Sequence, residues 1–199
     1  MKLLLTGVWV ALIGVSQGGQ DRLPLDEAQR YAKVCVELLG SLTDTPINLD
    51  VDVEKPCAVR GEGGGAMIVP DKSLSKERLA KLGQDVVPVG QLWLRKWTPV
   101  VAGKPVAKDR LRVVTLRVDD KDRPMPLLLL GVRKHGDKGL ELVGYARDSE
   151  PILALPLKRI EFIQALPVEL EWQRGDKNAD SLTLSVLGQY KAVLPIARE

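Results

Sequence analysis

The stretch 126–146, "PLLLLGVRKHGDKGLELVGYA", decides the fold class of this chain. Its four consecutive leucines, Leu127 to Leu130, are typical of a β-strand that is covered on both faces. A second apolar segment ends in Tyr145 and Ala146, and the polar, glycine-containing "RKHGDKG" between the two segments has the composition of a turn. The stretch therefore predicts two β-strands joined by a hairpin, of which the first is buried on both faces.

Similar segments on either side extend this pattern. From Leu111 onward, seven apolar or alternating segments are separated by short turns, at residues 110–118, 126–132, 140–146, 151–157, 168–172, 182–187 and 191–197. This spacing predicts an antiparallel β-sandwich or barrel-like module over residues 110–199. The segment 158–164, "KRIEFIQ", fits either a strand or a short helical turn. A polar stretch at residues 102–109 is the expected linker to the preceding region.

The preceding region, residues 17–105, is expected to combine a helix with short strands. Ala28, Ala32, Cys35 and Leu39 recur at helical spacing, which predicts an amphipathic helix over residues 26–40. The stretch 71–84, "DKSLSKERLAKLGQ", predicts a second, short helix with a serine at its N-cap. The predicted fold class is thus mainly β, of the α+β type.

The glycine-rich stretch 60–66, "RGEGGGA", fits the pattern G-x-G-x-x-G/A of dinucleotide-binding proteins. In those proteins a helix begins within the motif and its amides hold the pyrophosphate. Here the strand-like "AMIVP" follows, and Pro70 would interrupt a helix. The stretch predicts a flexible hairpin loop, and no cofactor is expected.

The two cysteines, Cys35 and Cys57, predict a disulfide bond, because an even count in an exported chain favours one. Closing this loop would stabilise the fold by about 3 kcal/mol in the chain-entropy model. Two buried free thiols are the alternative. No metal site is predicted, because a structural zinc site needs four ligands and the chain has one histidine.

The stretch 89–98, "VGQLWLRKWT", supplies the candidate ligand-binding residues. In a strand, Trp93, Arg95 and Trp97 would share one face. Such a face could stack on a sugar ring or a partner's surface. Since aromatic residues make up only 4% of the chain, the two tryptophans are also the natural core fillers, and this second interpretation is favoured.

No catalytic residue is predicted. Ser73 and Lys76 match S-x-x-K, but the other elements of penicillin-recognising enzymes are missing. His135 lies in a charged turn, where the sheltered pocket of a catalytic histidine is hard to build. A hydrolase whose site is dispersed along the sequence stays open as an alternative.

The first 16 residues predict a signal peptide, with Lys2 before an apolar run and cleavage near Ser16. The run is shorter than the ~20 residues that cross a bilayer, so no integral membrane segment is expected after cleavage. Lysine and arginine number 29 against 26 acidic residues, and both signs are scattered, which argues against a nucleic-acid partner.

These observations predict a secreted or periplasmic, non-catalytic β-rich protein. Its expected role is that of a protein-interaction or envelope-associated module. The alternative is a carbohydrate or small-ligand binder that uses Trp93 and Trp97, so that a protein or a polysaccharide is the expected partner.

Overall fold

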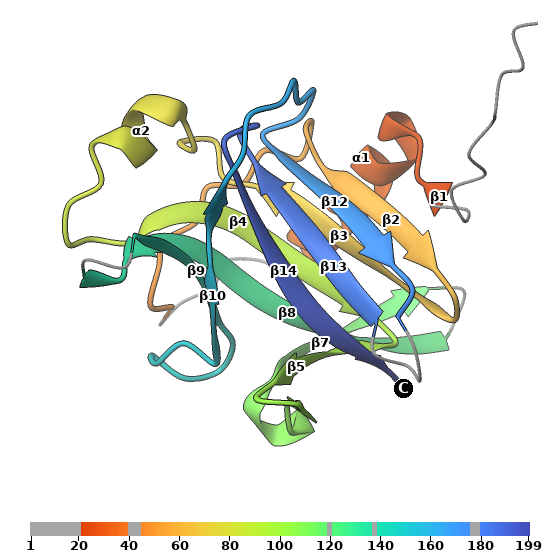
Figure 1. The fold of residues 1–199 in the computed structure, drawn as a ribbon. Helices are drawn as coiled ribbons and strands as arrows, with labels where there is room; N and C mark the ends of the chain where they lie inside the picture. The colour runs from red at the N-terminus through yellow and green to blue at the C-terminus, as the bar shows by residue number, and fades with distance from the viewer. Residues whose placement is uncertain (1–20, 40–44, 119–120, 137–138, 176–179) are drawn as a thin grey trace, which may run out of the picture.

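The structure, a computed structural model, describes residues 21–39, 45–118, 121–136, 139–175 and 180–199, so the predicted signal peptide lies outside the described residues. Two antiparallel sheets face each other, and one helix covers the outer face of the larger sheet (Figure 1). This confirms the predicted fold class. The helices are α1 (Leu25–Leu39), α2 (Lys76–Ala80) and the 3-10 turn η1 (Lys108–Arg110). The strands are β1 (Asp21–Arg22), β2 (Cys57–Gly61), β3 (Gly64–Pro70), β4 (Val87–Arg95), β5 (Trp97–Val101), β6 (Lys104–Pro105), β7 (Arg112–Val118), β8 (Lys121–Lys134), β9 (Leu140–Tyr145), β10 (Leu153–Pro156), β11 (Lys158–Arg159), β12 (Val168–Gln173), β13 (Asp180–Val186) and β14 (Tyr190–Arg198).

The larger sheet has the strand order β1-β2-β3-β4-β8-β9-β10, and the smaller sheet has the order β12-β13-β14-β5-β6 with β11 paired to β14. Strand β8 is the longest, and it pairs with β7 along its first half and with β4 and β9 along its second half. Both sheets contain strands from either side of residues 102–109. Among the described residues, neither α1 nor α2 has the length and apolar composition of a membrane-spanning helix.

The four leucines of β8 alternate between two separate cores. Leu128 and Leu130 lie in the core between the two sheets, whereas Leu127 and Leu129 lie in a second core on the opposite face. All four side chains are at most 1% exposed, which confirms that the strand is covered on both sides. Because side chains alternate along a strand, one apolar run supplies both cores.

The second core is covered by α1, whose bounds agree with the predicted helix within one residue. Ala28, Ala32 and Cys35 face the sheet and are buried. The two alanines let the helix backbone approach closely, since their side chains end at Cβ. Residues 45–53 and strand β7 cover the rest of this face, through side chains such as Ile47 and Leu116.

The glycine-rich stretch forms the predicted hairpin, with β2 and β3 joined by Glu62 and Gly63. Gly63 has a φ of 72°, a conformation that glycine adopts freely. The hairpin is not a loose loop, however. A Cβ atom on Gly64 would lie 2.3 Å from Nε1 of Trp97, and one on Gly61 would lie 2.6 Å from the Trp172 ring. The missing side chains make room for two indole rings.

An ion-pair network holds the same hairpin to the smaller sheet. Asp180 is fully buried, and its Oδ2 lies 3.0 Å from Nε of Arg198. Arg198 also pairs with Glu62 in the hairpin turn at 2.9 Å. The rings of Trp97 and Trp172 stack beneath, with centroids 6.1 Å apart. The turn is therefore fixed by charge on one side and by aromatic packing on the other.

Replacing Gly64 by alanine is expected to lower the free energy of unfolding by about 3 kcal/mol, because the added methyl overlaps a fully buried tryptophan. Gly83→Ala is the matched control, since open space surrounds that position and its change should stay within about 0.5 kcal/mol. Urea unfolding of both variants measures the difference. Equal stabilities would show that the hairpin is as loose as the sequence alone suggested.

Candidate functional site

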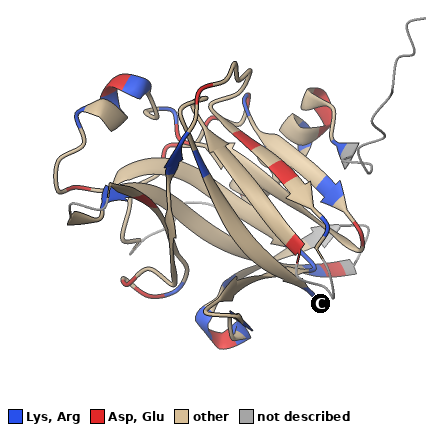
Figure 2. Cartoon of the chain, viewed as in Figure 1, with Lys and Arg blue, Asp and Glu red and all other residues tan. Residues whose placement is uncertain are grey.

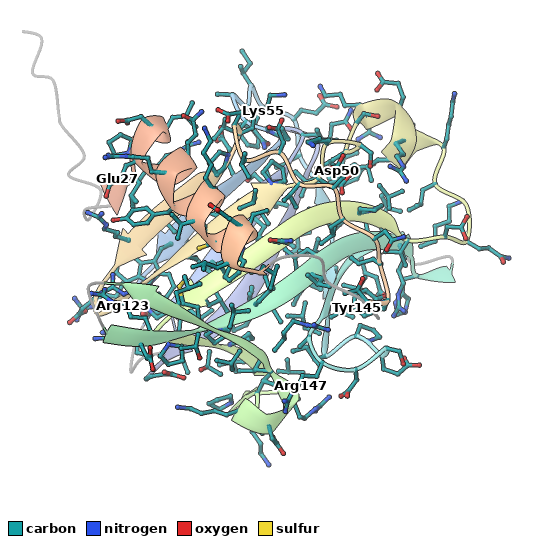
Figure 3. The ribbon with its side chains drawn as sticks, turned by 180° about the vertical axis from the view of Figure 1, so that it is seen from behind. Glu27, Asp50, Lys55, Arg123, Tyr145 and Arg147 are labelled. Carbon is teal, nitrogen blue, oxygen red and sulfur yellow. The ribbon has the colours of Figure 1, made fainter. Side chains whose placement is uncertain are left out.

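A hollow of about 260 Å³ opens between α1, strands β2 to β4 and the β7–β8 hairpin. Figure 3 shows α1 crossing the back of the larger sheet, with Glu27 on the helix and Arg123 on the β7–β8 hairpin. The lining of the hollow is mostly apolar and includes three arginines. It consists of Leu23, Tyr31, Cys35, Ala58, Val59, Arg60, Gly65, Ala66, Met67, Trp93, Arg95, Leu116, Arg123 and Met125. We call this the arginine-rimmed pocket.

The register of three strands builds the apolar floor of this pocket. Ala58 on β2 lies opposite Met67 on β3, which lies opposite Trp93 on β4. Residues paired in this way project from the same face of a sheet, so the three side chains form one row. Trp93 is fully buried in this row, and no described residue accepts a hydrogen bond from its indole nitrogen.

The next row along the same strands supplies the positive charge. Arg60, Gly65 and Arg95 are cross-strand partners, so the glycine separates two arginines and leaves the space between them open. The third guanidinium comes from Arg123 on β8, which is paired with Leu116 on β7. The pocket is thus apolar at its floor and basic along one side.

Only one of the three arginines has an acidic partner within the described part of the chain. Arg60 forms an ion pair with Glu27 of α1 at 2.5 Å. Neither Arg95 nor Arg123 forms an ion pair with a described carboxylate, although Arg123 is half-buried. An anion at this rim would therefore bind two guanidinium groups without displacing a carboxylate from either of them.

The expected Trp93–Arg95–Trp97 ladder does not form. Lys96 has a φ of 56°, which ends β4 and turns the chain, so that β5 starts at Trp97 in the other sheet. Trp93 consequently lies in the core under α1, and Trp97 lies in the core between the sheets. Both are 0% exposed, which confirms the favoured interpretation as core residues and leaves no open ring face for a sugar.

The predicted Cys35–Cys57 disulfide is wrong, because both thiols are free and buried. Cys35 lies in the core under α1, together with Ala58, whereas Cys57 points into the core between the sheets. Consecutive residues of a strand face opposite sides, so the sheet itself separates the two sulfur atoms. The backbone N–H of Leu170 donates to Sγ of Cys57 at 3.2 Å.

The S-x-x-K pair is not assembled into a catalytic dyad. The Ser73 hydroxyl donates to Asp71 and accepts from Arg78, while Lys76 is exposed at the start of α2. Asp71 is buried, and it also accepts from the backbone of Asp50 at 2.8 Å, so this serine belongs to a group of contacts that fixes the chain around residues 50 and 71.

The side chain of His135, the residue that follows β8, contacts a buried carboxylate. Its Nδ1 lies 2.6 Å from Oε2 of Glu141, and Arg133 donates to the other carboxylate oxygen at 2.6 Å. Burial by itself would raise the pKa of Glu141, but the hydrogen bonds from Arg133 and His135 outweigh it and leave the pKa below its usual value. No serine or cysteine of the described residues is paired with this histidine, so the group has the contacts of a structural ion cluster.

Sequence reasoning identified Trp93 and Arg95 but missed the rest of the pocket. Arg60, Arg123 and Met67 reach it from three strands, and their proximity depends on strand pairing that no local pattern encodes. Comparison of the chain with protein-family models, with characterised proteins and with solved structures finds no match. The pocket therefore has to be interpreted from its own chemistry.

Both thiols are expected to be unreactive in the folded protein. Burial raises the pKa of Cys35 to about 11 and also raises that of Cys57, so little thiolate is present at pH 8. Ellman's reagent should modify neither thiol in the native protein and both after unfolding in urea without reductant. A count of zero after unfolding would show that a disulfide exists.

Glu141 is expected to contribute to stability in a pH-dependent way. Its pKa is lowered in the folded state, so its contribution is present above the unfolded value of about 4.3 and is lost as the pH falls through the folded value. Glu141→Gln should lower the free energy of unfolding at pH 7 by about 1.5 to 3 kcal/mol, the usual range for hydrogen bonds to a charged group. This loss should shrink below pH 4. Glu37→Gln, on the exposed side of α1, is the control, and it should change the free energy of unfolding at pH 7 by less than about 0.5 kcal/mol in urea unfolding.

Proposed function

We propose that this protein is an exported, non-catalytic binding module whose arginine-rimmed pocket takes a small amphipathic anion. The observation that supports this most strongly is the combination of an apolar lining, which includes Met67 and Met125, with two guanidinium groups, Arg95 and Arg123, that have no described acidic partner. A ligand with a hydrocarbon part and one carboxylate matches both features. The proposed export rests on the residue pattern of the first 16 positions.

The size of the pocket limits the ligand. Its volume of about 260 Å³ lies just below the ~300 Å³ at which pockets for drug-sized ligands begin. A fatty acid of about eight carbons would place its chain against Met67 and Met125 and its carboxylate at the rim. Methionine side chains adapt readily to such a chain.

Octanoate is the probe for this proposal, and 1-octanol is its uncharged counterpart. Isothermal titration calorimetry should show octanoate binding that weakens about fourfold for each methylene removed, from ~0.8 kcal/mol per buried CH₂. In the double variant Arg95→Gln, Arg123→Gln, octanoate affinity should fall at least tenfold while octanol affinity stays the same.

The matched control for charge is Arg30→Gln, Arg110→Gln, which removes two exposed arginines outside the pocket lining. This variant should bind octanoate as the unmodified protein does. Equal octanoate affinity in both double variants, or the absence of binding at millimolar octanoate, would contradict the proposed site. Thermal unfolding of each variant shows that the fold is retained.

A second candidate function, a protein-interaction module, is supported by a separate observation. Tyr31, Val34 and Leu38 form an apolar stripe on the outer side of α1, with exposures of 49%, 45% and 56%. Such a stripe at helical spacing is what a partner's hydrophobic groove receives. Val34→Ser with Leu38→Ser should leave the melting temperature nearly unchanged, since both side chains are exposed, while reducing complex formation with a partner in analytical ultracentrifugation. Octanoate binding should not change in this variant.

A further inference from the structure

The loop of residues 160–167, between β11 and β12, exposes apolar side chains at one end of the sandwich. Ile163 is 99% exposed and Phe162 is 45% exposed. In Figure 1 the chain between β10 and β12 projects beyond the ends of the strands. We call this segment the apex loop. It lies outside the arginine-rimmed pocket and is independent of the function proposed for it.

The apex loop is held in place by hydrogen bonds from one side chain. Nε2 of Gln164 donates to the carbonyl oxygens of Leu166 and Ser185 at 2.6 and 3.0 Å, and its Oε1 accepts from the backbone of Gly188 at 2.6 Å. The backbone N–H of Phe162 also donates to the carbonyl oxygen of Gly188. Ile163 is therefore presented to solvent by a fixed loop, so little further ordering is needed for it to enter an apolar phase.

Among the described residues, the base of the apex loop carries more positive than negative charge. Lys158 on β11 lies directly opposite Lys191 on β14, and both side chains are exposed. Like charges in this arrangement repel each other, and neither lysine forms an ion pair with a described carboxylate. Arg159 adds a third cation, whose contact with Glu161 at 3.8 Å is exposed to solvent. Figure 2 shows basic segments at this end of the molecule.

The surface next to the apex loop continues the apolar character. Ala165 and Leu166 line a hollow of about 260 Å³ together with Leu25 and Pro56. Leu25 itself is 45% exposed. The end of the molecule therefore has an apolar tip, an apolar flank and a basic base.

We propose that the apex loop docks this protein on the surface of an anionic lipid bilayer. Ile163 and Phe162 enter the boundary between headgroups and acyl chains, and Lys158, Arg159 and Lys191 contact the anionic headgroups above them. The order along the loop, apolar at the tip and basic behind it, is the order of depth that a bilayer surface requires. A protein partner would instead bury about 800 Å² of matching surface on each side, whereas this loop offers a narrow, projecting tip.

Sedimentation with vesicles tests the proposal. The protein should bind vesicles containing 30% phosphatidylglycerol and should bind pure phosphatidylcholine vesicles much more weakly. Ile163→Ser should reduce the partition coefficient at least tenfold. Lys158→Gln and Lys191→Gln should each reduce it about fivefold, from ~1 kcal/mol per basic residue near an anionic surface. Added salt should weaken the binding.

Two matched variants serve as controls. Val193→Ser removes an exposed apolar side chain from β14, and Lys104→Gln removes an exposed lysine from β6; neither should change vesicle binding. All variants carry the same residues 1–16, so any contribution of that segment cancels in the comparison. Because Ile163 is exposed, its variant should keep the melting temperature of the unmodified protein. Unchanged binding of Ile163→Ser, equal binding to both vesicle types, or binding of this end to an acidic protein but to no vesicle, would overturn the proposal.

Discussion

A sheet that is apolar on both faces has to be covered on each face, and this constraint determines the arrangement of the whole molecule. Strands β4 and β8 carry buried side chains at successive positions. Leu92 of β4 and Leu128 of β8 lie in the core between the sheets. Trp93 of β4 and Leu127 of β8 lie in the core under α1. The smaller sheet covers one face. Helix α1, residues 45–53 and β7 share the other face, and they are separate pieces. A cover made of separate pieces leaves a gap more readily than a continuous sheet does, and the arginine-rimmed pocket lies between two of these pieces.

The polarity of that pocket follows from where the strands end. The row of Ala58, Met67 and Trp93 lies beneath α1 and is apolar, as a covered row must be. One row further along, the strands approach the edge of the cover, and Arg60 and Arg95 appear on the same face. Arginine at such a position can keep its aliphatic part on the apolar floor and its charge at the solvent boundary. The same sheet geometry thus produces an apolar floor and a basic rim without any specialised loop.

Local sequence patterns were sufficient to predict most helices and strands but not which strands pair with each other. The run Leu127–Leu130, the helix near residues 26–40 and the glycine hairpin were all predictable, because each depends on periodicity or turn composition within a few residues. The end of the strand before Lys96 was not predictable, because the residue composition does not indicate a positive φ at a lysine. That single residue sends Trp97 to the other core and removes the expected aromatic face.

The same limit explains why the disulfide was predicted wrongly and why most of the pocket was not predicted. The even cysteine count was a sound reason to expect a bond, but only the strand register shows that Cys57 points away from α1. Arg60 and Arg123 are 63 residues apart in the sequence. Both line the pocket because β4 pairs with β8 and so joins their strands in one sheet. The short spacing between Trp93 and Arg95 made that part of the site visible in advance, whereas long-range pairing is not encoded in any window of the sequence.

The position of β14 has a consequence for how the chain folds. This strand is the last described element, yet it lies inside the smaller sheet, between β13 and β5, and its Arg198 lies opposite Trp97 in the register. Arg198 is also the cation that neutralises the fully buried Asp180. Neither the smaller sheet nor this charge pair can be completed before β14 is free to pair with β5 and β13. Closing the smaller sheet is therefore a long-range event, because β5 pairs with a strand that lies far along the sequence.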